Sequence, residues 1–564
     1  MKNYYVRRGL RTYCSEVLVL IISAFILSLA FPGFVTSSGW GWIAFFALIP
    51  VFAVIKNTSY KAVWAYGFFF GVIFYCFFNY WLPGFHPGAI YIVTVIKGGE
   101  MMLLFPAMKI AASAFKRYAF IPQAFIWAAY AYLSQNWFAG YPYGTICYAL
   151  YEYLPLIQIA DITGIWAIII MMILPQAWLG YYFAGVFSGS DANILHYSKK
   201  SIAFITVYAV LFALWFGYGI VSIKAQEERV PDRYWKVATI QHNHDSWEGG
   251  YQTYLQNFNN LRRLSLEALR YDPDIVVWSE TAFVPSVWWH MNYSYEGVGN
   301  TIGNRETAEL VRRFVSFAEE LDKPLLTGNP RGVLKDESKP PIDPVTGELN
   351  RTDYNTVILF DDGTIKQSYA KQHLVPFTEH FPYKDSMPWL YDILVSLDFN
   401  WWEKGDEPVV FDSDGVKFST PICYEDVFGD ISADFVRNGA DLIINMTNDR
   451  WSGCAEAATQ HAAIATFRSV ETRKTMVRST NSGYTCMILP TGEIVDPVEQ
   501  FKMTYHIYDV PVYETKSADD LTFYVKHTDL FAYISIGIAA LSVVSGLCMI
   551  VYGRFSHKKD MKNV

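Results

Sequence analysis

Two strongly apolar regions flank a less apolar middle segment, and this distribution restricts the fold more than any other feature of the chain. Crossing the roughly 30 Å hydrocarbon core of a bilayer takes about 20 apolar residues in a helix. Seven candidate windows precede residue 224, and one follows residue 522. They lie at residues 17–31, 40–55, 62–81, 89–108, 119–133, 164–186, 202–223 and 530–552.

The net charge also changes sign along the chain. It is +7 for residues 1–223, −18 for residues 224–522 and +3 for residues 523–564. An acidic middle segment argues against nucleic acid as a partner, because phosphate binding needs positive charge. We therefore expect three parts with the same boundaries: an N-terminal transmembrane bundle of seven spans at residues 1–223, a soluble domain at residues 224–522, and a C-terminal transmembrane helix with a short tail at residues 523–564.

Lysine and arginine in the connections predict the orientation, because short loops rich in these residues stay in the cytoplasm. Basic residues precede the first window and follow the second, fourth and sixth. The connections after the first, third and fifth windows contain no lysine or arginine. This alternation predicts that both termini are cytoplasmic and that the acidic domain lies on the other side of the membrane.

Lys97 and Glu100 are three residues apart inside the fourth window, on one face of the expected helix. Ionisable residues within a membrane are costly and usually face the protein interior. We favour an internal salt bridge near a helix end over a contact with substrate. The windows hold few other ionisable residues, so a transporter is a weaker interpretation of this chain.

From residue 235 the pattern changes to short β-branched runs that alternate with amphipathic helices. Helices are expected at residues 251–271, 305–321 and 455–474, where apolar residues recur at three- and four-residue spacing. This order predicts a layered α/β domain. Strands are expected at residues 236–241, 274–278, 325–328, 354–360, 365–369, 416–424, 442–446, 476–478 and 484–489.

Two long aromatic stretches, residues 281–299 and 382–405, fit neither pattern. Packing within the domain would explain them. We favour insertion into the membrane interface, where Trp and Tyr side chains are common. The tryptophans concerned are Trp288 and Trp289 in the first stretch, and Trp389, Trp401 and Trp402 in the second.

Three reactive side chains lie at or just beyond the ends of predicted strands, where α/β domains place their sites: Glu280, Lys371 and Cys423. A thiol with a pKa near 8.5 needs a base and a nearby positive charge to act as a nucleophile at neutral pH. Glu280 can take and return the proton, while Lys371 stabilises an oxyanion. Taken singly, each residue also has an ordinary structural explanation, as a helix cap, a solvated strand end or a small buried side chain.

The motifs around these residues resemble the nitrilase, or carbon-nitrogen hydrolase, superfamily and its Glu-Lys-Cys triad. Together with the multi-span N-terminal region and one closing span, they resemble the apolipoprotein N-acyltransferase family over nearly the whole chain. The motifs are VVWSETAF around Glu280, KQHLVPFTEHFP at Lys371, ICYE at Ile422, TNDRW at Thr447, RSTNSG at Arg478, GYPYG at Gly140 and QIADITGIWA at Gln158.

The resemblance implies a nitrilase-like αββα sandwich domain outside the cytoplasm and a membrane α-helical bundle of about eight spans. It also implies a two-stage reaction. Cys423 would take an acyl chain from a phospholipid as a thioester and pass it to the α-amine of the S-diacylglyceryl cysteine of an apolipoprotein. Glu280 would be the base and Lys371 the oxyanion stabiliser. Further site residues carried over from the family motifs are Glu379, Glu425 and Tyr424 in support, and Asn448 and Trp451 in substrate binding.

The family further implies a monomeric enzyme of the bacterial inner (cytoplasmic) membrane, with a periplasmic catalytic domain and no metal or organic cofactor. Thr378 and Ser452 depart from the family pattern, close to the expected site. Two other functions fit the same residues. One is a membrane-anchored nitrilase-type amidase, and the other is a catalytically inactive scaffold that binds lipoprotein or lipid.

Overall fold

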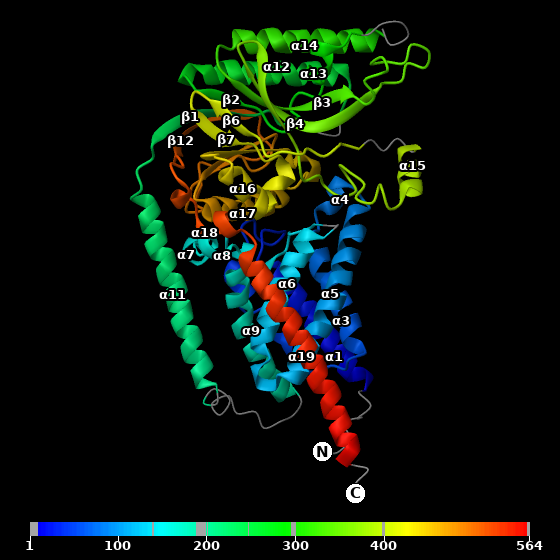
Figure 1. The fold of residues 1–564 in the computed structure, drawn as a ribbon, viewed down its shortest axis with the longest axis vertical. Coiled ribbons are helices and arrows are strands. Elements are labelled where there is room, and N and C mark those ends of the chain that lie inside the picture. Colours follow the sequence, from blue (N-terminus) through cyan, green and yellow to red (C-terminus); the bar gives the residue numbers. More distant parts are fainter. Residues whose placement is uncertain are drawn as a thin grey trace. The chain divides into compact units, whose positions relative to one another are not determined.

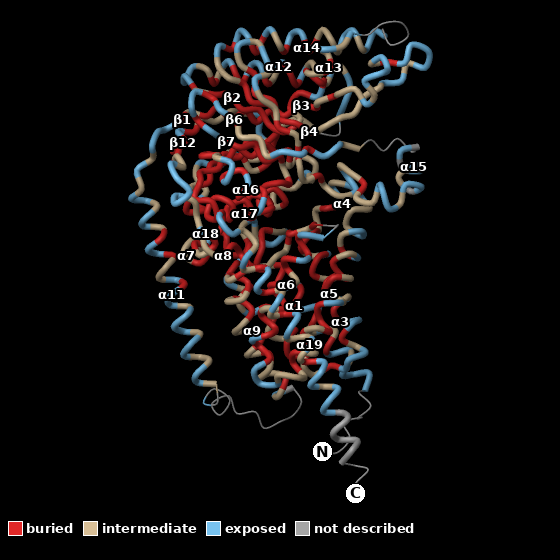
Figure 2. The backbone as a smooth tube through the Cα atoms, in the orientation of Figure 1, coloured by how far each residue is buried: buried red, intermediate tan, exposed pale blue. Residues whose placement is uncertain are grey.

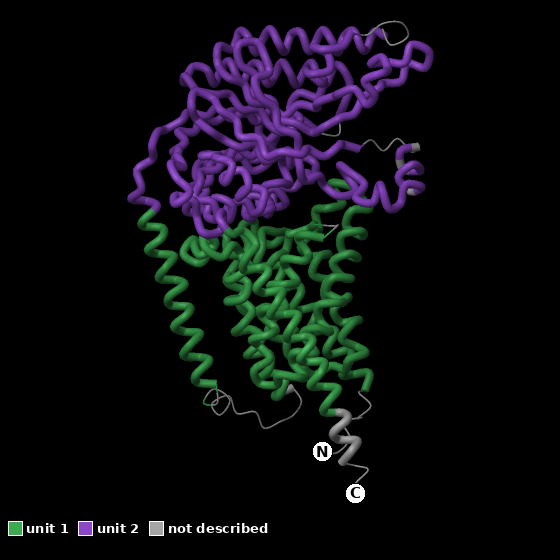
Figure 3. Tube along the Cα trace, in the orientation of Figure 1, with its two compact units in different colours: residues 1–225, 527–564 green, residues 226–526 purple. Residues whose placement is uncertain are grey.

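The computed structural model describes residues 9–137, 140–187, 199, 201–245, 248–294, 301–396 and 401–560. Two compact units divide the chain (Figure 3). Unit 1 comprises Met1–Ala225 and His527–Val564, and unit 2 comprises Gln226–Lys526. Each unit has a buried interior of its own (Figure 2).

Unit 1 is helical, and five of its described helices are long and apolar enough to cross a membrane, by length and composition. The expected windows at 40–55, 62–81 and 119–133 coincide with shorter helices. The five long helices are α1 (Leu10–Ser28), α5 (Ala89–Ala114), α9 (Trp166–Phe187), α11 (Ile202–Glu227) and α19 (Leu530–Asp560). The shorter elements are η1 (Gly41–Phe45), α2 (Ile49–Asn57), α3 (Ala62–Phe78), α4 (Leu82–Phe85), η2 (Lys116–Tyr118), α6 (Phe120–Asn136), η3 (Ile146–Leu150), α7 (Leu154–Ile157) and α8 (Ala160–Thr163).

Two glycines allow α3 and α5 to pack closely in unit 1. A Cβ atom on Gly67 of α3 would come within 2.2 Å of the Met101 carbonyl oxygen of α5, and one on Gly71 within 2.8 Å of the Lys97 carbonyl oxygen. Helices in a membrane associate through such close backbone contacts rather than through hydrophobic burial. These two glycines therefore determine how near α3 can approach α5.

Unit 2 contains two six-stranded sheets. In each sheet three adjacent strands are parallel and the flanking strands are antiparallel. The first sheet has the order β12 (Thr504–Val512), β1 (Arg233–Gln241), β2 (Ile275–Val277), β3 (Leu325–Leu334), β4 (Arg351–Asp361) and β5 (Thr364–Ala370). The second has the order β11 (Ile494–Val495), β10 (Cys486–Ile488), β9 (Thr475–Thr480), β8 (Leu442–Thr447), β7 (Val416–Ser419) and β6 (Val410–Ser413).

The sheets face each other between two helical layers, as Figure 1 shows for unit 2. The Trp235 ring of β1 lies 5.4 Å from the Phe418 ring of β7. On the outer face of the first sheet, α12 (Tyr251–Ala268) and α14 (Ile302–Glu320) share one apolar core with the strands. On the second, α17 (Ala455–Thr472) packs against β8 and β9, with α16 (Gly429–Arg437) beside it. These four layers agree with the αββα sandwich that we expected.

The strand expected at residues 416–424 is too long. It ends at Ser419, and Cys423 instead begins the short 3₁₀ helix η6 (Cys423–Val427). Pro421 has no N–H to donate to a strand ladder, which ends regular pairing at that point. The helix expected at residues 251–271 consists of α12 and the 3₁₀ helix η4 (Leu269–Tyr271). The sequence analysis also missed β6, β11, β12, α16 and three short helices: η7 (Asp449–Ser452), η8 (Ala518–Asp520) and α18 (Phe523–His527).

The two aromatic stretches differ from each other. The first forms α13 (Val287–Asn292), and its Trp289 is only 1% exposed, so insertion of that side chain into a membrane interface is wrong. The second contains α15 (Pro388–Ser396), where Trp389 is 62% exposed. Membrane insertion of the second stretch remains a prediction. Residues 295–299 and 397–400 of these stretches lie outside the described part of the chain.

Candidate active site

Glu280 and Lys371 come from the first sheet. Glu280 lies three residues after β2, and Lys371 directly follows β5. Lys371 Nζ lies 3.7 Å from Glu280 Oε1 and 2.8 Å from Glu379 Oε1. All three side chains are largely buried, so the two carboxylates share one ammonium away from bulk water.

A glycine sets the position of Glu280. A Cβ atom on Gly328 of β3 would lie 2.7 Å from Glu280 Cα and 2.4 Å from the Thr281 nitrogen. No side chain fits at such distances from backbone atoms. The glycine therefore lets β3 pass directly against the segment that carries the candidate base.

Cys423 has an unusual backbone conformation, with φ at 49°. Residues other than glycine rarely adopt this region, and those that do cluster at functional sites. Asn445 of β8 supports the turn by donating from Nδ2 to the Cys423 carbonyl oxygen at 3.3 Å and to the Pro421 carbonyl oxygen at 3.1 Å. The second sheet thus holds Cys423 in a conformation that the local chain disfavours.

The Cys423 thiol interacts with the Glu280 carboxylate and with the Thr447 side chain. Burial, and next the Glu280 carboxylate, raise the pKa of the Cys423 thiol well above its ordinary value. Burial also raises the pKa of Glu280, although the Lys371 ammonium opposes this effect. The resting thiol is therefore protonated, and it can become a nucleophile as its proton moves to Glu280.

Lys371 stays charged in this setting. Burial alone would lower its pKa, but the carboxylates of Glu379 and then Glu280 outweigh burial and raise the pKa of Lys371. An ammonium in a buried site interacts strongly with any negative charge that develops nearby. The arrangement can therefore combine a thiol nucleophile, a base and a fixed cation.

Glu379 and Glu425 each fix one part of the site. Glu379 also accepts from the Val375 N–H at 2.7 Å, and Glu425 accepts from the N–H groups of Ile422, Gln372 and His373 at 2.7 to 3.0 Å. Burial raises the pKa of Glu425, and the backbone donors oppose that rise. Glu425 thereby ties the residue before Cys423 to the two residues that follow Lys371.

The remaining predicted site residues are Asn448 and Trp451, at and within η7, and Tyr424, in η6. The Asn448 N–H donates to Glu280 Oε2 at 3.1 Å, so Asn448 reaches the triad through its backbone. Trp451 is half-buried in η7. Tyr424 is buried, with its ring 5.2 Å from that of Phe428 and 6.3 Å from that of His373. The substrate-binding roles of Asn448 and Trp451 and the supporting role of Tyr424 remain predictions.

Asn355 was missed by the sequence analysis. Its Nδ2 donates to Glu280 Oε1 at 2.9 Å and to Glu379 Oε1 at 3.2 Å. It lies inside β4, where nothing in the sequence distinguishes it from other polar strand residues.

Among the residues that the structure describes, no group of three or more His, Cys, Asp or Glu side chains is arranged to hold a metal ion.

The chain is similar to known proteins over its whole length. Residues 236–519 match the carbon-nitrogen hydrolase family, and residues 23–178 match the apolipoprotein N-acyltransferase N-terminal domain. Apolipoprotein N-acyltransferase 1 of Treponema denticola is 33% identical over 570 residues, which cover 100% of both chains. The chain belongs to the apolipoprotein N-acyltransferase family. This confirms the resemblance inferred from the sequence motifs.

Apolipoprotein N-acyltransferase 1 of Treponema pallidum is also 33% identical, over 89% of this chain and 91% of its own length. Among solved structures, an amidase from Nesterenkonia sp. is 16% identical, with a TM-score of 0.36, and the match covers 54% of this chain and 98% of that one.

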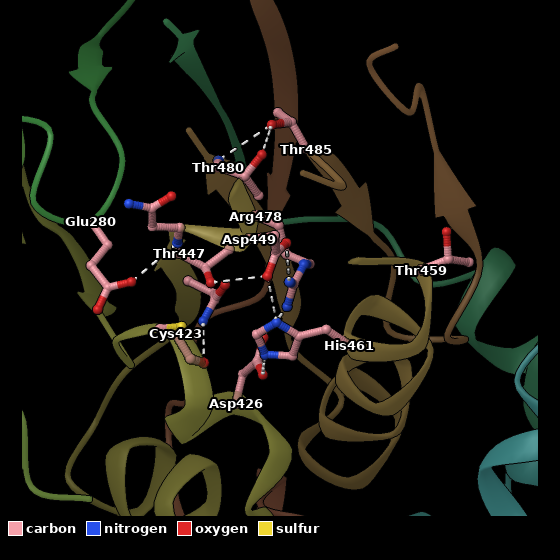
Figure 4. A network of polar contacts seen from close by, with 12 residues as sticks. Glu280, Cys423, Asp426, Thr447, Asp449, Thr459, His461, Arg478, Thr480 and Thr485 are labelled. Carbon is pink, nitrogen blue, oxygen red and sulfur yellow. Dashed lines mark hydrogen bonds and ion pairs between the residues drawn. The ribbon is translucent and has the colours of Figure 1, made fainter. Parts of the chain in front are cut away.

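Beside the triad, this member of the family has a buried network of four charged side chains (Figure 4). Arg478 pairs with Asp426 and lies 3.7 Å from Asp449. His461 bridges the same two carboxylates, at 2.7 Å from Asp426 Oδ1 and 2.9 Å from Asp449 Oδ1. Asp426 lies in the 3₁₀ helix that starts at Cys423, and Asp449 follows Asn448. The network therefore braces both segments that approach Glu280.

The charge state of His461 gives a testable pH dependence. Burial alone would lower the pKa of His461, but the charge of Asp426, assisted by Asp449, raises it to about 9. The folded protein then holds the proton more tightly than the unfolded chain does, so the stabilisation is complete below about pH 6.5 and is lost as the pH rises through about 9. Its full size is on the order of 3 kcal/mol.

We expect the melting temperature of the wild type in detergent to fall across this pH interval, and that of His461→Gln to fall much less. Thermal unfolding of both proteins at several pH values measures the difference. An equal decline in both proteins would contradict a buried imidazolium.

Proposed function

We propose that this protein moves an acyl chain from a phospholipid, through a thioester on Cys423, to the α-amine of the S-diacylglyceryl cysteine that begins an apolipoprotein. The observation that carries the proposal is the buried arrangement of Glu280, Cys423 and Lys371 in a chain that matches its relatives over the full length. Lipoprotein N-acylation is what the names of those relatives imply.

In the first stage the Cys423 sulfur attacks an ester carbonyl carbon of the phospholipid while the thiol proton passes to Glu280. Lys371 balances the charge on the carbonyl oxygen. The ester C–O bond then breaks, and Glu280 returns the proton to the leaving oxygen. The products are the thioester and a lysophospholipid with a free hydroxyl group.

In the second stage the neutral α-amine of the acceptor attacks the thioester. A C–N bond forms, the C–S bond breaks, and the proton lost by the amine passes through Glu280 to the thiolate. Dividing amide formation into two substitutions lets one nucleophile serve two lipid substrates in turn. Exclusion of water from the thioester is what separates transfer from hydrolysis.

The proposal includes an arrangement in the membrane. Residues 1–223 and 523–564 would provide eight spans, with both termini in the cytoplasm, and residues 224–522 would form the catalytic domain in the periplasm. The lysine and arginine distribution supports this orientation, and the long apolar helices of unit 1 support the anchoring. We expect a monomer in the inner membrane of a bacterium.

The intact mass of the purified full-length protein tests the reaction. After incubation with phospholipid vesicles, we expect a gain of one acyl chain that hydroxylamine removes and that a diacylglyceryl-cysteine peptide discharges as an amide. Discharge by water alone would identify a hydrolase of the amidase type. Absence of the adduct, while an acyltransferase of known activity forms one, would favour an inactive scaffold.

A further inference from the structure

Thr447 is the last residue of β8, where the segments that carry the nucleophile and hold the base come together. Ile422 forms a parallel bridge with Met446, so the next residues of the two segments, Cys423 and Thr447, are neighbours in register. The residue after Thr447 is Asn448, whose N–H donates to the carboxylate of the candidate base at 3.1 Å. Thr447 is fully buried. Its side chain is therefore fixed beside the reacting groups and away from bulk water.

The thiol responds to this neighbour. Burial, and next the Glu280 carboxylate, raise the pKa of the Cys423 thiol well above its ordinary value. Of the other groups that act on it, the Asp449 carboxylate raises the pKa, whereas the Lys371 ammonium and the Thr447 side chain lower it. A hydroxyl group lowers the pKa of a thiol by donating a hydrogen bond to the thiolate. Thr447 thus favours the charged form of the sulfur, although it carries no charge itself.

The hydrogen of this hydroxyl has a second acceptor. Thr447 Oγ1 donates to Asp449 Oδ1 at 3.5 Å, which is a long hydrogen bond (Figure 4). Burial alone would raise the pKa of Asp449, but the charge of His461, followed by that of Arg478, lowers it, so Asp449 is ionised. His461 Nδ1 lies 2.9 Å from the same oxygen. Asp449 therefore keeps a close partner when Thr447 donates elsewhere.

A change of acceptor requires little movement. The hydrogen of a hydroxyl group reorients by rotation about the C–O bond, while the oxygen stays in place. The side chain of a threonine in a strand is otherwise stiff, because its β-carbon is branched. One fixed oxygen can therefore donate to Asp449 while the sulfur is a thiol, and to the sulfur while it is a thiolate.

We propose that Thr447 is a further catalytic residue, whose hydroxyl turns from Asp449 to the Cys423 sulfur and stabilises the thiolate. The inference rests on the proposed function, in which charge develops on the sulfur twice. In the first stage the thiol proton passes to Glu280 as the sulfur attacks. In the second stage the C–S bond breaks and the sulfur leaves as a thiolate. Thr447 keeps its own proton in both stages, so Glu280 remains the base.

A purely structural threonine would behave differently. Its hydroxyl would serve only to satisfy Asp449, and its removal would lower the melting temperature without changing the reactivity of Cys423. Thr447→Val separates the two roles, because valine has nearly the same shape and is favoured in strands. Thr447→Ser restores a hydroxyl group without the methyl group.

Alkylation of Cys423 by iodoacetamide tests the proposal without any lipid. The rate is measured from pH 7 to 10 in the purified full-length protein, by the mass of the peptide that contains Cys423. We expect Thr447→Val to react about tenfold more slowly at pH 8 and to titrate at higher pH, because the thiolate has lost a hydrogen bond to a charged atom. Thr447→Ser should recover most of the wild-type rate.

Thr466→Val is the matched control. Thr466 is also fully buried in unit 2, but its hydroxyl donates to the Ala463 carbonyl oxygen of its own helix, α17, at 2.8 Å. This variant should be alkylated like the wild type. Equal rates in Thr447→Val and the wild type would overturn the role of Thr447, and so would equal slowing in the two valine variants.

The second stage has its own measurement. Thr447→Val that has been loaded with an acyl chain should transfer it to a diacylglyceryl-cysteine peptide about tenfold more slowly than the loaded wild type, since the leaving thiolate is less stable. Unchanged transfer would overturn the role of Thr447 in this stage. Failure of the wild type to form an acyl adduct would contradict the proposed function instead, and the alkylation rates would be unaffected by that result.

Discussion

Replacement of Cys423 by serine will abolish the acyl-enzyme and lower acyl transfer by at least about 10³-fold. A hydroxyl group is far less acidic than a thiol, so transfer of its proton to Glu280 becomes much harder even though the side chain keeps its size. The intact-mass assay and a lysophospholipid-release assay measure the two effects separately.

Glu280→Gln should lower the rate by about 10² to 10⁴, because the amide cannot take the thiol proton. Cys454→Ser provides the control, since Cys454 is a half-buried cysteine in the same unit. It should load and transfer like the wild type. If the adduct is lost in Cys454→Ser but not in Cys423→Ser, Cys423 is not the nucleophile.

Arg478→Met will destabilise unit 2 far more than the loss of a surface arginine. Arg478 is fully buried between Asp426 and Asp449, and its removal takes away one of the two cationic side chains, Arg478 and His461, that contact these carboxylates. Removing one partner of a buried ion pair lowers the free energy of unfolding by about 3 to 5 kcal/mol, since the uncompensated charge that remains cannot reach water. Chemical unfolding of the detergent-solubilised protein measures the loss.

Arg312→Met is the matched control, because Arg312 pairs with Glu309 at the surface of the same unit and is 69% exposed. It should cost less than about 1 kcal/mol. Adding Asp426→Asn to Arg478→Met should recover part of the loss, since one uncompensated charge is removed. Equal effects of the two arginine variants would show that the buried network contributes no more than a surface pair.

The grouping of Glu280, Lys371 and Cys423 could be predicted from the sequence because two kinds of information coincided. Glu280 and Lys371 follow strands that are recognisable from β-branched runs, and the sequence motif around Cys423 resembles that of a known family. The same reasoning did not predict the turn that presents Cys423. Its positive φ depends on Asn445, which lies on a neighbouring strand 22 residues further along the chain.

The charged residues around the triad were missed for a related reason. Asp426, His461 and Arg478 lie in a 3₁₀ helix, an α-helix and a strand, and each alone is an ordinary polar residue. Only the packing of these elements brings their charges together. In unit 1, by contrast, the three-residue spacing of Lys97 and Glu100 was enough to predict their pairing, because both lie on one helix.

The position of β12 in the first sheet has a consequence for the synthesis of the protein. This strand pairs with β1 along nine residues, although more than 260 residues separate the two in the chain. Contacts between such distant segments form late in folding, because a long loop must close first. A ribosome has to make residue 512 before β1 gains its outer neighbour. The first sheet therefore cannot be completed until nearly all of unit 2, which ends at Lys526, has been translated.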